Sequence, residues 1–181
     1  MSRKAGDQQN GQVEFQLAVF QTPLGWFGLL GNDGQLVRIR IGCSDRQATI
    51  DAFDEDTEGA PVELTSWHPD LEYRLRRFAN GEKVEFADVE VVWPRPLTEF
   101  RKRVIEQTRK IKWGQTMSYG VLAERSGTPR AARAVGSTMA TNRFPIVVPC
   151  HRVVSASDLG GFTAPTGVSL KRQLLAMEAD D

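Results

Sequence analysis

A cysteine, a histidine and an arginine follow one another after an apolar stretch: Cys150, His151 and Arg152 come after residues 144–149. A thiol with a free pKa of about 8.5 is mostly protonated at neutral pH, so a nucleophilic cysteine needs a base or a cationic neighbour. The apolar stretch predicts a strand that ends at Cys150. Because neighbouring side chains on a strand point to opposite sides, His151 would act through a bent backbone or a bridging water. Taken alone, the pair favours a buried cysteine beside a structural histidine over a nucleophile and its base.

A carboxylate near the C-terminus extends this pair toward a triad. Leu170, Leu174 and Met177 mark the buried face of a C-terminal helix, and Glu178 falls beside that face. A buried carboxylate is costly unless it is paired. With Cys150 and His151 it would supply nucleophile, base and orienting group. By spacing alone, Glu178 could equally be solvated.

Three helices are predicted upstream of the cysteine. The first spans about 97–111, with Thr98 as its N-cap, and the second begins after Ser118 and ends at Gly127. The third takes Thr128 as N-cap and Pro129 as its first residue, and runs to about residue 141. Two short helices with a tight glycine turn are a helix-turn-helix pattern. The small residues of the third helix would allow close approach to DNA or, equally, to another helix.

The first half of the chain predicts an antiparallel sheet with one wet face. Alternating patterns around residues 15–19 and 37–41 flank the apolar run 26–30, with turns between them. An acidic loop at 51–58, a helix over about 71–78 that ends at Gly81, and a strand over 84–92 follow. The Trp-Pro-Arg-Pro segment 93–96 is a stiff connection. The expected organisation is therefore a flexible tail (1–12), an N-terminal α/β domain (13–93) and a C-terminal domain (97–181).

The charge is divided between the halves. The 181 residues have zero formal net charge, but residues 1–96 carry −6 and residues 97–181 carry +6. This asymmetry hints that the second half meets a polyanion, or else that it has a solvated basic face. A hydrophobic content of 40% and the absence of a long apolar run or signal peptide predict a cytoplasmic globular protein without membrane contact. Two cysteines and two histidines give no metal-ligand cluster.

The second half resembles a known family. The motifs are Ser-Tyr-Gly at 118–120, Arg-Ala-Val-Gly at 133–136, Asn142, Pro-Cys-His-Arg-Val at 149–153 and Gly-Gly-Phe at 160–162. Together with Lys171, Leu174, Leu175 and Glu178, and more loosely the Thr-Pro-Leu-Gly turn at 22–25, they resemble the methylated-DNA–protein-cysteine methyltransferases, or O6-alkylguanine-DNA alkyltransferases. The resemblance covers nearly the whole chain. It implies an α+β fold with a ribonuclease H-like sheet domain and a mainly helical domain carrying a winged-helix-like helix-turn-helix.

The resemblance implies stoichiometric DNA repair without a cofactor. A monomer would bind duplex DNA from the minor-groove side, flip an O6-alkylguanine out of the stack and take its alkyl group permanently. O4-alkylthymine is a further candidate substrate. In a bacterium the protein would lie with the nucleoid. Lesion-binding relatives of this family carry tryptophan in place of the reactive cysteine, so Cys150 argues against a non-catalytic sensor. A cysteine hydrolase is a third alternative.

The resemblance also implies residue roles. Cys150 would be the nucleophile, His151 its base through a water, and Glu178 the group that orients His151. Asn142 would brace the turn, and Tyr119 would donate to the base. Arg133 would enter the duplex in place of the flipped base. The other expected DNA contacts are Thr128, Arg130, Ala134, Gly136 and Ser137, and the expected pocket residues are Met139, Val153, Gly161, Phe162 and Thr163. Arg130 and Lys171 could be phosphate contacts or solvated charges.

The chain departs from the family pattern at three places. Lys112-Trp113 stands where Pro-Tyr is usual, Phe162 stands where tyrosine is common, and the loop 163–167 is longer than expected. These departures concern the pocket wall and its substrate range, not the nucleophile. Some relatives carry zinc in the N-terminal domain, and this chain lacks the ligands for it.

Overall fold

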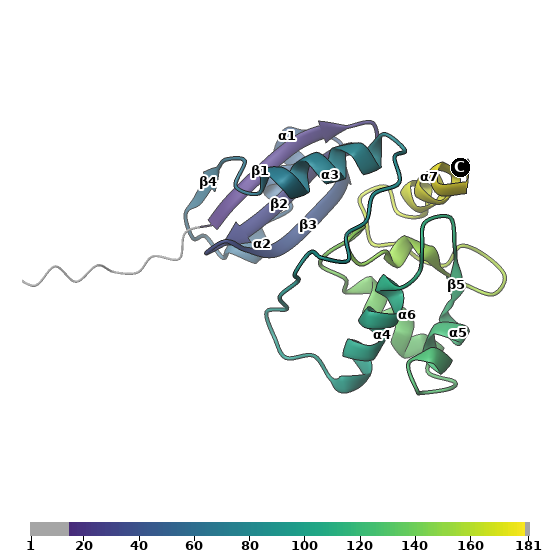
Figure 1. Cartoon of the computed structure of the whole chain (residues 1–181). Helices are drawn as coiled ribbons and strands as arrows, with labels where there is room; N and C mark the ends of the chain where they lie inside the picture. Colours follow the sequence, from purple (N-terminus) through teal and green to yellow (C-terminus); the bar gives the residue numbers. More distant parts are fainter. Residues whose placement is uncertain (1–14, 180–181) are drawn as a thin grey trace, which may run out of the picture.

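The structure is a computed structural model that describes residues 15–179, so the tail predicted at 1–12 lies outside the described residues. A four-stranded sheet forms the N-terminal part, and a group of helices forms the C-terminal part (Figure 1). Strands β1 (Phe15–Thr22), β2 (Gly25–Asn32) and β3 (Gln35–Cys43) pair antiparallel in a meander. Strand β4 (Val62–Leu64), which the sequence did not reveal, pairs parallel with β1 and completes the order β3-β2-β1-β4. The mixed α+β class is as predicted.

The sheet has no wet face, contrary to the prediction. Leu17 and Leu30 on one face pack under Phe53, and helix α1 (Arg46–Asp51) contacts β1, β2 and β3. The predicted acidic loop folds as α2 (Asp54–Thr57) together with the end of α1. The other face packs against helix α3 (Pro69–Ala79), whose Leu71, Leu75 and Phe78 are fully buried as the helical spacing predicted. The alternation of polar and apolar residues along β1 and β3 had predicted that the face covered by α1 and Phe53 would be exposed to solvent.

The strand predicted over 84–92 is wrong. The segment has no regular structure, and its apolar residues Phe86 and Val89 join the core. Its carbonyl groups are hydrogen-bonded outside any sheet. The Arg109 guanidinium donates to the carbonyls of Phe86, Ala87 and Val89 at 2.9–3.0 Å. Because β4 occupies the sheet edge beside β1, residues 84–92 do not join the sheet, and they connect the two parts of the chain as an irregular segment.

The helices of the second half begin mostly where their caps predict. Helix α4 (Glu99–Arg109) has Thr98 as its N-cap, and α5 (Tyr119–Arg125) has Ser118, each accepting from a backbone N–H three residues on. Helix α6 (Ala132–Ala140) begins later than expected, with Ala131 at its N-cap and no side-chain cap. Arg130 has a left-handed φ of +69°, so no helix can run through it from Thr128.

The strand predicted to end at Cys150 is also wrong. Residues 144–149 form tight turns, and Cys150–Arg152 form a single 3₁₀ turn, η1. The strand β6 (Val153–Val154) begins only after it and pairs parallel with β5 (Met117–Ser118). Ile146 has a φ of +73°, which an extended strand excludes for a β-branched residue. The backbone at Cys150 is therefore bent, which allows successive side chains to work on one site.

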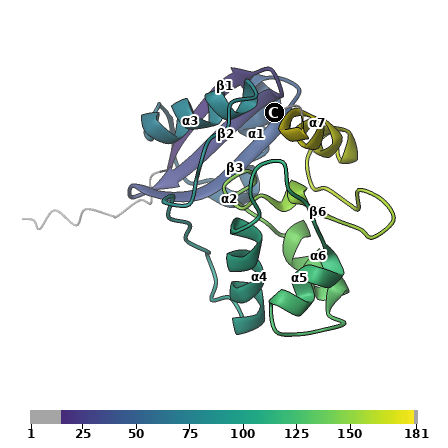
Figure 2. The same cartoon turned by 45° about the vertical axis from the view of Figure 1, so that its right-hand side comes forward.

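The C-terminal helix α7 (Val168–Ala179) joins the two parts. It lies beside the sheet in Figure 2, and Leu170 and Leu174 belong to the same buried cluster as Phe27, Ile41 and Phe78. Gly42 of β3 has a φ of +72°, and a Cβ added there would come within 2.5 Å of Leu170 Cδ2, so any other residue would be strained and would displace the Leu170 side chain. α7 also contacts η1, and it thereby carries Glu178 to the cysteine segment. None of the helices within 15–179 is long and apolar enough to cross a membrane.

Candidate active site

Cys150 is held by the side-chain amide of Asn142. The Asn142 Nδ2 group donates to Cys150 Sγ at 3.0 Å and to the carbonyl of Val148 at 2.9 Å, while Oδ1 accepts from the backbone N–H of Phe144 at 3.0 Å. One residue just after α6 thus holds both Cys150 Sγ and the turn that precedes it. The bracing role predicted for Asn142 corresponds to these contacts.

His151 and Glu178 are in direct contact and fully removed from water. His151 Nε2 lies 2.9 Å from Glu178 Oε1, and the ring of Phe78 from α3 packs 6.2 Å from the imidazole, centroid to centroid. Burial lowers the pKa of His151 below its ordinary value despite the opposing effect of Glu178, so the imidazole is neutral at pH 7. A carboxylate only accepts, so Nε2 carries the proton. Nδ1 keeps a free lone pair, and it has no hydrogen-bond partner within residues 15–179.

Arg152 completes the environment of the carboxylate. Its Nε donates to Glu178 Oε2 at 2.9 Å, its Nη2 donates to Oε1 at 2.8 Å, and its Nη1 donates to the carbonyl of Ile111 at 2.7 Å. The backbone N–H of Gly114 also reaches Oε2, at 3.3 Å. Burial raises the pKa of Glu178, but the hydrogen bonds from His151 and Arg152 outweigh it and lower the pKa to about 2. Glu178 is therefore paired rather than solvated, which settles the alternative that spacing left open.

Lys171 is a buried cation close to the nucleophile, and both alternatives offered for it from the sequence are wrong. Its side chain is completely buried, so it is neither a phosphate contact nor a solvated charge. Its Nζ donates to the carbonyls of Val153 at 2.6 Å and Gly161 at 3.2 Å, which ties α7 to the segment after the cysteine and to the pocket wall. Sequence spacing gave no signal for this, because Leu170 and Leu174 account for the buried face of α7 on their own.

Two opposing influences set the protonation of Cys150. Burial raises the pKa of the thiol, while the Asn142 hydrogen bond and the positive charge of Lys171 lower it, and burial prevails. The resting group is therefore the neutral thiol. Its reaction as a nucleophile needs a base, and the unprotonated Nδ1 of His151 is the base that the buried environment leaves available.

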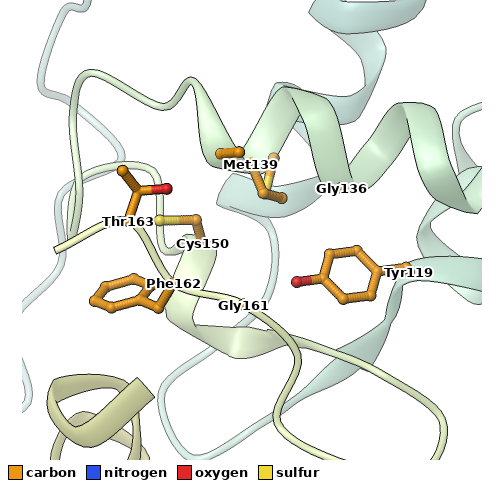
Figure 3. Close-up of a pocket in the computed structure, with 8 residues that line it drawn as sticks. Tyr119, Gly136, Met139, Cys150, Gly161, Phe162 and Thr163 are labelled. Carbon is orange, nitrogen blue, oxygen red and sulfur yellow. The ribbon is translucent and has the colours of Figure 1, made fainter. Parts of the chain in front are cut away.

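A cavity of about 320 Å³ opens over Cys150 (Figure 3). Its wall is formed by Tyr119, Gly136, Met139, Ala140, Cys150, Gly161, Phe162 and Thr163. The Tyr119 hydroxyl points into it, and burial raises the pKa of this phenol, so it remains a proton donor. Gly160 abuts the ring, since an added Cβ would lie 2.8 Å from the Tyr119 hydroxyl oxygen. The volume suits a planar ring system of nucleobase size.

Val153 is the expected pocket residue that the structure places elsewhere. It is fully buried in a cluster with Val104, Leu122 and Val135, and it does not line the cavity. The reason is its place in β6, where pairing with Met117 directs the side chain into the core. Met139, Gly161, Phe162 and Thr163 do lie in the cavity wall.

The residues expected to contact DNA lie on the outside of α6 and in the turn before it. Arg133, Ala134 and Ser137 are exposed, and so are Thr128 and Arg130 in the preceding turn. Gly136, one helical turn from Ala140, borders the cavity from the same helix. A surface of small side chains with arginine at its start therefore adjoins the opening over the cysteine.

Comparison with known proteins agrees with this site. Residues 99–180 match the family model for the DNA-binding domain of 6-O-methylguanine DNA methyltransferase. A methylated-DNA–protein-cysteine methyltransferase of Mycolicibacterium paratuberculosis is 35% identical over 158 residues, 87% of this chain and 88% of that protein. A crystal structure of Mycobacterium tuberculosis O6-methylguanine methyltransferase superposes with a TM-score of 0.75 at 30% identity, covering 92% and 93% of the two chains. A second, of M. tuberculosis OGT in complex with DNA, gives 0.72 at 31%, covering 91% and 93%.

Fold and site together define a cysteine-dependent transferase of the α+β class whose second half is a DNA-binding domain. The chain belongs to the methylated-DNA–protein-cysteine methyltransferase family. This confirms the family predicted from the sequence.

The depressed pKa of Glu178 predicts how acid affects stability. A folded pKa of about 2 against an ordinary 4.5 contributes free energy of unfolding that is fully present above about pH 4.5 and is lost as pH falls through about 2. The contribution is on the order of 3 kcal/mol. We expect the stability gap between the wild type and Glu178→Gln, measured by urea denaturation, to be widest at pH 5 and above and to narrow steadily toward pH 3.

The matched control is Glu124→Gln, an exposed glutamate on α5. It should leave the free energy of unfolding within about 0.5 kcal/mol of the wild type across the same range. A gap for Glu178→Gln that is independent of pH would show that the carboxylate is not held in its charged form by His151 and Arg152.

Proposed function

We propose that this protein repairs DNA by transferring the alkyl group of O6-alkylguanine to Cys150 in a single turnover. The observation that carries the proposal is the position of Cys150 Sγ, which is held at 3.0 Å by Asn142 at the wall of a cavity of about 320 Å³, next to a neutral buried histidine. The relatives named above are called methylated-DNA–protein-cysteine methyltransferases, and this supports the same reaction here.

The proton moves before the alkyl group does. Nδ1 of His151 takes the thiol proton through a bridging water, and the Glu178 carboxylate on Nε2 stabilises the imidazolium that results. The positive charge of Lys171 and the Asn142 amide stabilise the thiolate. The charges of Glu178 and Lys171 thus favour the imidazolium of His151 and the thiolate of Cys150 during the transfer. At rest, burial keeps His151 and Cys150 neutral.

The thiolate attacks the alkyl carbon, and the bond from that carbon to guanine O6 breaks. The electron pair of the broken bond passes to the guanine, and the Tyr119 hydroxyl donates a hydrogen bond to this leaving base. The base then takes up one proton, and the proton that His151 took from the thiol returns through water, so that guanine and imidazole both end neutral. The Thr163 hydroxyl lies in the same wall and is our candidate partner for O6. A thioether is not hydrolysed under these conditions, so the protein is consumed after one reaction.

DNA binding is assigned to the exposed face of α6. The alkyl carbon is out of reach inside a duplex, so the base must rotate into the cavity. The small side chains of Ala134, Gly136 and Ser137 would permit the close approach that docking in the minor groove needs, and Arg133 at the start of the helix would fill the space that the base leaves. Helices α5 and α6 pack together, and we propose that they act as a helix-turn-helix, with Thr128 and Arg130 on phosphates.

The division of labour follows the two parts of the chain. Residues 97–181 would form the DNA-binding and alkyl-transfer domain, and residues 13–93 a supporting N-terminal domain, in a protein that acts as a monomer on duplex DNA. The reactive cysteine and its base distinguish this proposal from a lesion sensor without catalysis. The departures at 162–167 concern the wall of the cavity and would tune which alkyl groups fit.

Mass spectrometry of the intact protein tests the reaction. After incubation with a duplex that contains one O6-methylguanine, we expect the mass to rise by one methyl group per molecule, and Cys150→Ser to show no gain. The matched control Cys43→Ser removes the other thiol, which is buried outside this cavity wall, and should react fully. No mass gain together with tight binding of the same duplex would contradict transfer and favour the sensor.

A variant at the start of α6 tests the docking mode. Arg133→Ala should slow base flipping, followed by 2-aminopurine fluorescence, by roughly tenfold or more while weakening binding of undamaged duplex only about two- to threefold. The reason is that the filling side chain stabilises the duplex while the base leaves the stack and after it has left, whereas undamaged duplex that is bound without flipping does not need it. Arg172→Ala, an exposed arginine on α7, is the control for general charge loss. Equal losses in flipping and in binding would remove Arg133 from this role.

A further inference from the structure

A relay of hydrogen bonds runs from the sheet to the nucleophile. Strand β3 lies at the edge of the sheet (Figure 1), and the backbone N–H of its Ile39 donates to the carbonyl of Arg143 at 2.8 Å. The same peptide group, through the backbone N–H of Phe144, donates to Asn142 Oδ1 at 3.0 Å. The Asn142 amide in turn donates through Nδ2 to Cys150 Sγ at 3.0 Å. Three amide groups are therefore linked in series, and each donates toward the sulfur.

The direction of these bonds favours the thiolate over the thiol. A hydrogen bond that an amide accepts polarises it and strengthens the bond that it donates, so amides in series donate more strongly than one alone. A hydrogen bond to a charged acceptor is also roughly twice as strong as one to a neutral acceptor. The Asn142 amide therefore stabilises the thiolate of Cys150 more than its neutral thiol, and the two peptide groups behind it add to this preference.

The side chain of Arg143 fastens the middle of the relay to the N-terminal part of the chain. Its Nε donates to the carbonyl of Val37 at 3.3 Å, and its Nη2 donates to Asp56 Oδ1 of α2 at 2.7 Å. Alternate residues of an edge strand turn their backbone groups away from the sheet, and Arg143 binds two such groups, the N–H of Ile39 and the C=O of Val37. The Asp56 and Arg143 side chains are only 4% and 19% exposed, so water and salt screen this ion pair little.

We propose that Arg143 is a positioning residue for the alkyl transfer, which holds the 143–144 peptide between β3 and Asn142 so that the Asn142 amide stays on Cys150 Sγ. The inference rests on the proposed function, because the reaction that the relay assists is the alkyl transfer. It gives the N-terminal part of the chain a place in that reaction besides support. Without the Arg143 side chain, the segment after α6 would separate from β3 more often, and the amide would spend less time on the sulfur.

Loss of positioning and loss of packing change the thiol in opposite directions. Burial raises the pKa of the Cys150 thiol, whereas the Asn142 hydrogen bond lowers it. A displaced amide therefore raises this pKa, while a general loosening that admits water lowers it. The other titratable or charged groups that face the sulfur are Lys171 of α7, Tyr119 of α5 and His151 of the same turn. The remaining cavity wall, from α6 and the segment 161–163, is neutral.

Arg143→Met, made in a Cys43→Ser background that leaves one thiol, tests the positioning role. We expect it to slow single-turnover methyl transfer at pH 7 roughly fivefold. We also expect the pH at which Cys150 reacts half-maximally with iodoacetamide, followed by mass spectrometry, to rise by about half a unit or more. Arg143→Lys keeps the charge toward Asp56 and should recover most of both.

The matched control is Arg38→Met. Arg38 binds the same oxygen of Asp56 at 2.9 Å, and its side chain is 21% exposed, but that side chain has no part in the relay. Its loss should leave the transfer rate within about twofold of the wild type and the pH of half-maximal reaction unchanged.

A double-mutant cycle tests whether Arg143 acts through the amide. In an Asn142→Ala background the amide is gone, so Arg143→Met should change the remaining transfer rate less than about twofold. Losses that multiply in the double variant would show that Arg143 acts by another route, and the proposal would be wrong.

Other outcomes also decide the question. Equal slowing by Arg143→Met and Arg38→Met, or a pH of half-maximal reaction that is unchanged or lowered in Arg143→Met, overturns the positioning role. If Arg143→Met does not fold, as judged by circular dichroism, Arg143→Gln carries the same expectations, because it lacks the charge but can still donate to Val37. A wild type that transfers no methyl group overturns the proposed function, whereas the iodoacetamide measurement tests the hold of Arg143 on the thiol independently of that reaction.

Discussion

A carboxylate buried between an arginine and a histidine is the interaction on which the site depends. Glu178 is 2% exposed, and a charge at such a position is tolerated only because Arg152 binds both of its oxygens and His151 binds one. The three residues come from α7 and η1, so the ion pair also fixes the last helix against the turn that carries the nucleophile. Through Ile111 and Gly114 it further anchors the segment between α4 and β5. Removing one partner would leave an uncompensated charge in the core.

The same buried arrangement explains why Cys150 is an unreactive neutral thiol at rest. Burial keeps the His151 imidazole neutral and the Cys150 thiol protonated, so the resting site carries no thiolate. Transfer of one proton converts both groups at once, and the charges that stabilise the products, on Glu178 and Lys171, are already in place. This preorganisation suits a protein that reacts only once, because premature oxidation or alkylation of the thiol would waste the molecule.

The sequence predicted the elements whose signals are local. The caps Thr98 and Ser118, the buried stripe of α3 and the meander of β1 to β3 all depend on neighbours within a few residues, and the structure has them. The contact of His151 with Glu178 was foreseen from the need to pair a carboxylate on a buried face. The family resemblance, rather than periodicity, supplied the roles of Tyr119 and Asn142.

The failures have long-range causes. Residues 84–92 look like a strand, but Arg109 takes their carbonyls and β4 takes the sheet edge. Thr128 is a good capping residue, yet α6 begins only at Ala132 because the backbone of Arg130 is left-handed. The apolar run before Cys150 owes its hydrophobicity to burial in turns, not to a sheet. Lys171 is buried because two carbonyls from distant segments converge on its Nζ, and no local pattern reports such a convergence.

The tautomer of His151 tests the account most directly, because the buried carboxylate fixes it. The chain has two histidines, so a ¹⁵N-histidine NMR spectrum is simple, and a His68→Gln variant assigns it. We predict that at pH 7 the His151 ring is neutral, with its proton on Nε2 and an unprotonated Nδ1, since its pKa is lowered. An imidazolium at pH 7, or a proton on Nδ1, would contradict the claim that Glu178 orients His151 as the base for Cys150.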